Sequence, residues 1–202
     1  SVIHSSNGNL LLDNGFSAKE LQKRMEDACI DPDSISAVLL THSHADHIRN
    51  LCFCRTKHLK TYLLKETFHD IYNEKKSMCI DPDSCIWIEP GQTYEICGIQ
   101  VKPFEVPHDV PTVGYTFNYR DYKIGYATDL GEVGNLAQQR LRACNLLVIE
   151  SNFDTKLLNQ YIFSLKDFPL HQKFLQFYIL SLFLQEFFVK NSSISTFLLL
   201  YL

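Results

Sequence analysis

The sequence of 202 residues predicts one α/β domain followed by a tail of unusual composition. Two features of the chain indicate this fold. Apolar segments of strand length alternate with amphipathic segments of helix length, and strand-like runs gather in the middle of the chain. The composition agrees, because 46% hydrophobic and 21% charged residues are typical of a globular protein with a sizeable core. We expect the domain at residues 1–160 and the tail at residues 161–202.

The first forty residues are expected to form a hairpin, a helix and a strand. Two apolar runs flank Ser-Asn-Gly at residues 6–8, which predicts a β-hairpin that turns on Asn-Gly. In residues 17–29 apolar side chains recur every four positions, so a helix is expected, with Ser17 as its N-cap. The short apolar run at 35–41 follows turn-forming residues and predicts a buried strand.

The rest of the domain continues the alternation of helices and strands. Helices are expected at residues 46–57, from about 65 to 76, and at 133–144. Strands are expected at residues 61–64, within 85–106, and at 112–119, 122–129 and 145–151. The hexapeptide CIDPDS occurs at 29–34 and again at 79–84, and its Asp-Pro-Asp core predicts the same turn before a strand in both places.

Three histidines and an aspartate lie close together, as His42, His44, Asp46 and His47, at the end of the strand predicted at 35–41. In an extended segment residues two apart point to the same side, so His42 and His44 can bind one metal ion. A chain that turns into a helix at Asp46 would direct Asp46 and His47 towards a second position. The pattern therefore predicts two divalent cations, with zinc preferred and manganese or iron as alternatives. The competing interpretation is a polar surface loop in which Asp46 only caps the next helix.

Two ligands for each cation are too few, so further ligands are expected at the ends of later strands. His108 follows one apolar run and Asp129 follows another. A carboxylate such as Asp129 can bridge two cations. The alternatives are that His108 is an ordinary loop histidine before Pro111, and that Asp129 caps a turn next to Gly131.

Charge and cysteine usage exclude some classes of protein. A net charge of −4 does not favour a non-specific nucleic-acid binder, although residues 55–60 include a short basic patch. Seven cysteines without a CxxC pair indicate neither a disulfide framework nor a zinc ribbon. Buried, reduced cysteines in a cytoplasmic protein are the expected arrangement.

The tail at residues 161–202 is rich in phenylalanine and leucine and contains no glycine. Its uninterrupted apolar stretches are too short to cross a bilayer, because Gln176, Gln185 and Glu186 divide them. We therefore expect no membrane partner. Apolar residues on all sides of a helix would instead be buried or would support self-association.

Four short segments together carry a resemblance to a known family. THSHADH, VPHD, ATDLG and LLVIESN resemble the metallo-β-lactamase superfamily, and their order is similar to its YycJ/WalJ-like subgroup of nuclease-like hydrolases. The resemblance covers about residues 1–160 and implies a four-layer αββα sandwich with a two-metal site at one edge. It also implies the ligands: His42, His44 and His108 for the first cation, Asp46 and His47 for the second, and Asp129 between them.

The resemblance implies a metal-dependent hydrolase of phosphodiester bonds, of DNA exonuclease type. A hydroxide shared by the two cations would attack phosphorus, and Asp46 would orient it. The family's lactamases have Cys where this chain has Asp129, which favours phosphoester over lactam chemistry. Small cyclic phosphodiesters are an alternative substrate, and a catalytically impaired metal-binding remnant is an alternative from another class.

The chain departs from the family pattern at both ends. The family has a last histidine ligand in a glycine-rich loop, whereas the only later histidine here, His171, lacks that context. Phe153 stands where the family has another histidine. We therefore expect a sandwich that is truncated in front and altered behind, with a weakly occupied second metal position.

Overall fold

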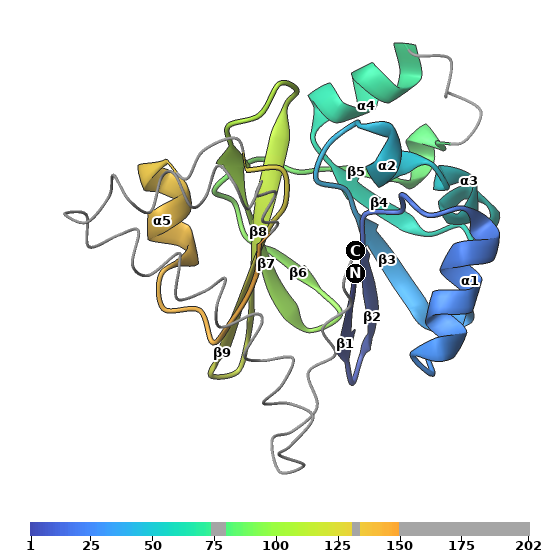
Figure 1. Ribbon diagram of the computed structural model, residues 1–202, viewed down its shortest axis with the longest axis horizontal. Coiled ribbons are helices and arrows are strands. Elements are labelled where there is room, and N and C mark those ends of the chain that lie inside the picture. The colour runs from blue at the N-terminus through green and yellow to red at the C-terminus, as the bar shows by residue number, and fades with distance from the viewer. Residues whose placement is uncertain (74–79, 131–133, 150–202) are drawn as a thin grey trace, which may run out of the picture. The chain divides into compact units, whose positions relative to one another are not determined.

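A computed structural model describes residues 1–73, 80–130 and 134–149. The described residues form two five-stranded sheets with helices beside them (Figure 1). The helices are α1 (Ala18–Asp27), α2 (Ala45–Ile48), α3 (Leu51–Thr56), α4 (Lys65–Ile71) and α5 (Asn135–Leu141). The strands are β1 (Val2–Ser5), β2 (Gly8–Leu12), β3 (Ile35–Leu39), β4 (Lys60–Leu63), β5 (Cys85–Trp87), β6 (Tyr94–Ile96), β7 (Ile99–Val106), β8 (Thr112–Tyr119), β9 (Tyr122–Ala127) and β10 (Leu146–Ile149).

The first sheet has the order β1-β2-β3-β4-β5. β1 and β2 form the predicted antiparallel hairpin, and β2 to β5 run parallel. Ser5 pairs with Gly8, so the two-residue loop is Ser6-Asn7 and the turn lies one residue earlier than predicted. Because β2 to β5 are parallel, the segments that follow them leave the sheet at one common edge, which is where α/β folds place functional sites.

The second sheet has the order β10-β9-β8-β7-β6. Strands β6 to β9 are joined as antiparallel neighbours, whereas β10 pairs with β9 in parallel. The long pairing of β7 with β8 runs from Gln100–Asn118 to Val106–Thr112, so the connection at residues 107–111 leaves the sheet at one end of that pairing. This connection carries His108.

Side chains on the strands alternate between two cores, and this alternation produces the layers. Leu10 and Leu12 of β2 pack with residues of the second sheet, such as Tyr115, whereas Leu11 packs on the other side with residues of α1 to α3. A third cluster joins α5 to the outer face of the second sheet. The order helices, sheet, sheet, helix confirms the predicted αββα sandwich.

The helix predicted at 46–57 is wrong, because the structure has two short helices there, α2 and α3. The break falls at Arg49 and Asn50. In a continuous helix the Asn50 N–H would bond to Asp46, but it donates instead to the Asn14 carbonyl at 2.9 Å. The Asn14 side chain in turn donates to the Asn50 carbonyl at 2.8 Å. A tertiary contact therefore takes the hydrogen bond that would have continued the helix.

Both copies of the Asp-Pro-Asp turn are confirmed. Asp31 and Asp81 each accept a hydrogen bond from the backbone N–H two residues later, and a short 3₁₀ turn follows each of them. The first turn leads into β3 and the second into β5. The repeated hexapeptide is therefore repeated turn chemistry.

The prediction of buried, reduced cysteines is only partly confirmed. Cys54 and Cys85 are buried and free, but Cys29 is exposed. Cys52 is disulfide-bonded, so the prediction is wrong for this residue.

Predictions for the tail, including His171 and any self-association, lie outside the described residues. Within the described residues, no helix combines the length and the apolar character needed to span a membrane.

Candidate metal centre

The histidine motif lies on the segment that connects β3 to α2. The Leu40 N–H still bonds to the Tyr62 carbonyl of β4 at 2.9 Å, so the chain remains extended as it leaves the sheet. His44 is also extended and is the N-cap of α2, which begins at Ala45. This local geometry matches the prediction of an extended His42-to-His44 segment that turns into a helix at Asp46.

Two hydrogen bonds connect this segment to the second sheet. The Val113 N–H of β8 donates to the Thr41 carbonyl at 3.0 Å, and the buried Tyr115 hydroxyl donates to the Leu40 carbonyl at 2.5 Å. These bonds hold the end of β8, and the β7–β8 connection next to it, against the histidine segment. His108 therefore reaches a motif that lies more than sixty residues earlier in the chain.

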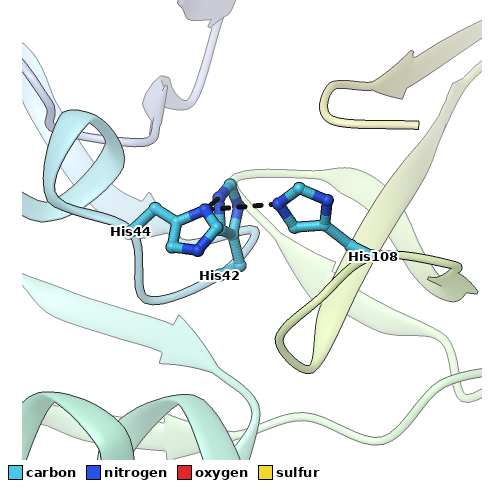
Figure 2. A group of neighbouring side chains, drawn as sticks. All are labelled: His42, His44 and His108. Atoms are coloured by element: carbon cyan, nitrogen blue, oxygen red, sulfur yellow. Dashed lines mark hydrogen bonds between the residues drawn. The ribbon is translucent and has the colours of Figure 1, made fainter. Parts of the chain in front are cut away.

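Three of the predicted ligands converge on one position. His42 Nε2 lies 3.0 Å from His44 Nδ1, and His108 Nε2 lies 3.2 Å from the same Nδ1 atom (Figure 2). The three donor atoms all lie within 4.8 Å of one another. His42 is completely buried, whereas the other two rings are partly exposed.

The separations of these nitrogens fit a shared cation. Zn–N bonds of about 2.0–2.1 Å in a tetrahedral site place neighbouring ligand nitrogens about 3.3 Å apart. The observed separations of 3.0 and 3.2 Å are close to that value. Imidazole nitrogens are good ligands for zinc and other first-row metals. The donor set at this position therefore fits a divalent metal ion.

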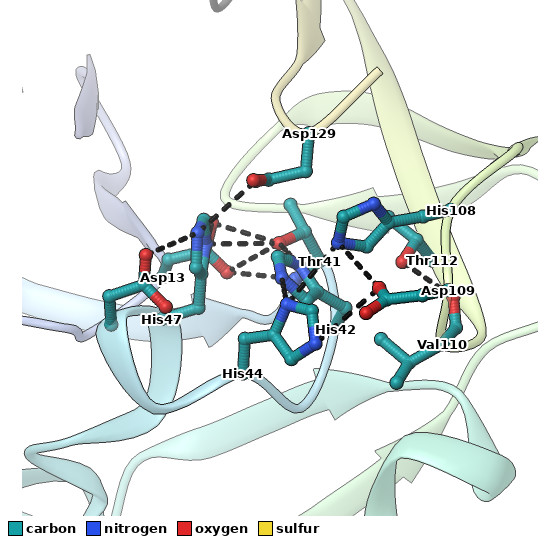
Figure 3. Close-up of polar contacts among 11 residues, drawn as sticks. Asp13, Thr41, His42, His44, His47, His108, Asp109, Val110, Thr112 and Asp129 are labelled. Carbon is teal, nitrogen blue, oxygen red and sulfur yellow. Dashed lines mark hydrogen bonds and ion pairs between the residues drawn. The ribbon is translucent and has the colours of Figure 1, made fainter. Parts of the chain in front are cut away.

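A second group of donors shares His42 with the first. His42, His47 and Asp129 offer donor atoms that lie within 4.8 Å of one another. His47 Nε2 is 3.2 Å from Asp129 Oδ2. Figure 3 shows this contact. Asp129 follows β9 and has a left-handed backbone with φ of 56°, a conformation that Asp tolerates better than most residues.

Asp46 is the predicted ligand that stands furthest out. Its Oδ2 atom lies 3.7 Å from His47 Nε2, and its side chain is 75% exposed. Among the described residues it is not part of either group of converging donors. It therefore faces solvent beside the second group, where a molecule that approaches from solvent would meet it.

Sequence reasoning missed Asp13, which contacts the histidine motif on its buried side. Its carboxylate accepts hydrogen bonds from the Thr41 N–H at 2.8 Å and from the Thr41 hydroxyl at 3.0 Å. It also lies 2.9 Å from His47 Nδ1, the ring nitrogen opposite to the one that faces Asp129 (Figure 3). The available signal was an aspartate directly after the apolar run of β2, at the sheet edge that carries the histidines.

Asp109 is the second residue that was missed. It follows His108, and its Oδ1 atom lies 3.0 Å from His108 Nε2 and 3.4 Å from His44 Nε2. Its side chain is 70% exposed. The local sequence offers only its position next to a predicted ligand as a signal, because the contact with His44 arises from the fold.

Gly15 fixes the distance between the turn after β2 and the histidine motif. A Cβ atom on this residue would lie 1.2 Å from the backbone oxygen of Asp46, which no side chain can tolerate. The neighbouring Asn14 N–H donates to the His47 carbonyl at 2.7 Å. Backbone therefore packs directly on backbone beneath Asp46 and His47.

The surroundings of the two buried histidines shift their pKa values in opposite directions. Burial, followed by the charge on His47, lowers the pKa of His42 to about 4. Burial also lowers the pKa of His47, but its hydrogen bond to Asp13 and the charge of that carboxylate act in the opposite direction. Asp129 and Asp46 add to the effect of Asp13, so the pKa of His47 rises to about 9. His42 is thus neutral and available to a cation, whereas His47 would have to lose a proton before it could bind one.

Comparisons with known proteins agree with the fold. The model of the β-lactamase superfamily domain matches residues 8–171. Exodeoxyribonuclease YycJ of Bacillus anthracis is 29% identical over 161 residues, which cover 78% of this chain and 60% of that protein. The chain thus spans about three fifths of the length of this relative.

Two solved structures show the same fold. Zn²⁺-bound PqqB from Methylobacterium extorquens has a TM-score of 0.65 at 19% identity, over 75% of this chain and 59% of that one. The short form of human tRNase Z has a TM-score of 0.59 at 16% identity, over 79% of this chain and 73% of that one.

Proposed function

Because the chain belongs to the β-lactamase superfamily, we propose that it is a metal-dependent hydrolase of phosphodiester bonds that acts on DNA as an exonuclease. The observation that carries this proposal is the pair of donor groups that share His42. Two adjacent cation positions are the arrangement that enzymes use to hold the attacking and leaving oxygens of a phosphoryl group.

The ligands proposed for the two cations come from the two donor groups and from Asp46, which lies beside the second group. His42, His44 and His108 hold the first cation, which we propose to be zinc. His47 and Asp46 would hold the second, and Asp129 would supply a carboxylate shared by the two cations. Manganese or iron would suit the second position as well, because carboxylate oxygens form part of its donor set. Bound cations would supply an activated water and would neutralise charge on the phosphoryl oxygens.

Asp46 is the proposed catalytic residue. Its carboxylate is exposed to solvent and lies 3.7 Å from His47 Nε2, so it could orient a water that binds beside the second donor group. Thr41 and Asp13 are almost completely buried, so we propose no catalytic role for them. They hold the rings of His42 and His47 in place from the buried side, at 2.9 Å from each ring.

The charge at the site and the similarity to a nuclease both support the proposed substrate class. The site gathers four imidazoles at a sheet edge, and because imidazoles bind a metal as neutral ligands, two bound cations would give the site a local positive charge in a chain whose net charge is −4. An anionic phosphodiester suits this local field. The similarity to an exodeoxyribonuclease supports DNA as the phosphodiester.

A hydrolysis assay on the full chain tests this proposal. We expect about two metal ions per chain, and release of nucleotides from end-labelled single-stranded DNA in the presence of Zn²⁺ or Mn²⁺. Replacing His44 with Ala should lower the rate by at least 100-fold, because it removes a ligand of the first cation. His69→Ala is the matched control, since His69 is exposed on α4 and lies outside both donor groups.

Assays with DNA, an aryl phosphodiester and a cyclic nucleotide separate the alternative functions. Hydrolysis of an aryl phosphodiester or a cyclic nucleotide without any cleavage of DNA would favour the small-substrate alternative and contradict the nuclease assignment. One ion or fewer per chain and no hydrolysis of any of the three would contradict the enzyme and favour a metal-binding remnant.

A further inference from the structure

Each motif histidine uses its two ring nitrogens for different purposes. One nitrogen faces the other donors, and the second faces an oxygen. For His42 the second nitrogen, Nδ1, points away from the other donors and lies 2.9 Å from the Thr41 hydroxyl. For His47 the second nitrogen is also Nδ1, and it lies 2.9 Å from Asp13. A ligand histidine commonly donates its other N–H to an oxygen in this way, which fixes both the tautomer and the ring orientation.

His44 is inverted relative to these two rings. Its inward nitrogen is Nδ1, which lies 3.0 Å from His42 Nε2 and 3.2 Å from His108 Nε2. The nitrogen of His44 that points away from the other donors is therefore Nε2. The oxygen beside that nitrogen belongs to Asp109, at 3.4 Å (Figure 3). Asp109 thus occupies, for His44, the place that Thr41 and Asp13 occupy for the other rings.

The position of Asp109 does not fit a direct ligand. Among the described residues, its oxygens are not part of the donor group formed by His42, His44 and His108. Its Oδ1 atom lies near Nε2 of His44, and the cation would lie on the Nδ1 side of that ring. The same oxygen also lies 3.0 Å from His108 Nε2, so the Asp109 carboxylate stands between the two rings.

We propose that Asp109 is a positioning residue for the first cation: it accepts the Nε2–H of His44 and so presents the Nδ1 lone pair of that ring to the cation. This inference rests on the proposed metal site. His44 needs such a partner more than the buried rings do, because its side chain is 37% exposed and packing alone does not fix its orientation. Loss of the carboxylate would free the ring to rotate or to change tautomer.

Zinc affinity, measured by competition with a chromogenic chelator, tests this role in the full chain. We expect the dissociation constant of the first zinc ion to rise about 10-fold or more in Asp109→Ala, the range seen when the outer partner of a ligand is removed. Asp109→Asn keeps an acceptor oxygen and should lose less affinity. Asp121→Ala, an exposed aspartate in the turn between β8 and β9, should bind zinc as the wild type does.

Nitrogen NMR of the metal-free protein gives a second measurement. In the wild type we expect the neutral His44 ring to carry its proton on Nε2, and in Asp109→Ala we expect a mixture of tautomers. Unchanged zinc affinity and an unchanged ring spectrum in Asp109→Ala would overturn the proposal. Loss of one full zinc equivalent from a folded Asp109→Ala protein would also overturn it, because the residue would then be a ligand.

These measurements separate the inference from the proposed function. A wild-type chain that binds zinc but hydrolyses no phosphodiester would contradict the proposed function and leave the role of Asp109 intact. A wild-type chain that takes up no zinc would overturn both proposals.

Discussion

His47 lies among three carboxylates, and this environment decides its charge. Asp13 approaches Nδ1 at 2.9 Å, whereas Asp129 and Asp46 approach Nε2 at 3.2 and 3.7 Å. The ring is only 8% exposed, so water screens these charges little. In the metal-free protein His47 therefore carries a proton where the proposed second metal ion would bind. The proton and that metal ion compete for the ring.

The raised pKa of His47 predicts a pH-dependent stability of the metal-free protein. The pKa is about 9 in the folded chain against an ordinary value of 6.5, so the protonated ring stabilises the fold. This contribution is complete below about pH 6.5 and is lost as the pH rises through about 9. We expect the wild type to exceed His47→Gln in free energy of unfolding at low pH, and this difference to shrink across the window.

Urea unfolding of both proteins with a chelator present, at pH values of about 6 and about 10, measures this difference. Comparison with His47→Gln removes the contribution of other groups that titrate in the same range. A difference that stays constant with pH would contradict the assignment.

At the scale of elements, the site depends on short connections held by the backbone. The turn after β2 donates from Asn14 to the His47 carbonyl and accepts from the Asn50 N–H. These bonds divide the segment after β3 into α2 and α3, and they place Asp46 and His47 over Gly15. The strands bring the loops that follow them to one edge of the sheet. The backbone hydrogen bonds between these loops then set the positions of the proposed metal ligands.

Gly15→Ala tests this close approach. The added methyl group would meet the Asp46 carbonyl, so the α2 segment must move. We expect a loss of about 1–3 kcal/mol in the free energy of unfolding, as for other overpacked positions. Binding of the second metal should weaken more than binding of the first, because His47 and Asp46 lie on the displaced segment.

Gly134→Ala is the matched control, because a Cβ atom there meets no neighbour within 4 Å. Chemical unfolding and metal titration of both variants provide the measurement. Equal effects of the two substitutions, or equal weakening of both metal positions in Gly15→Ala, would argue against a local displacement of α2.

At the scale of the whole molecule, the site exists only because two sheets meet. The first sheet supplies His42, His44 and His47, and the second supplies His108 and Asp129. Tyr115 joins the two sheets beneath the site, where its completely buried ring packs in the core and its hydroxyl donates to the Leu40 carbonyl. This bond fixes the second sheet against the segment that carries the histidines.

Tyr115→Phe is expected to loosen this junction. The substitution keeps the ring but leaves the buried Leu40 carbonyl without that donor, which should cost about 1–2 kcal/mol in the free energy of unfolding. Zinc affinity at the first position should fall too, because His108 comes from the other sheet. Tyr119→Phe, at the partly exposed end of β8, should change neither quantity. Unfolding and zinc competition measure both, and wild-type zinc affinity in Tyr115→Phe would contradict the role of the junction.

The sequence by itself predicted an α/β domain and its strands in outline, because the alternation of apolar residues is a local property that also decides which face of a strand is buried. The αββα sandwich was implied by the resemblance to a known family. The sequence also predicted that His42 and His44 point to the same side. Residue spacing within one extended segment determines that arrangement without any contact from the rest of the chain.

Only the tertiary structure decided what surrounds these rings. Asp13 lies 34 residues from His47 in the chain, and Asp109 meets His44 across the junction of the two sheets. The break between α2 and α3 likewise comes from Asn14, which is distant in sequence. Such contacts have no period and no local signature, because they depend on how complete elements pack. Spacing therefore predicted which histidines lie together, whereas packing placed the oxygens beside their rings.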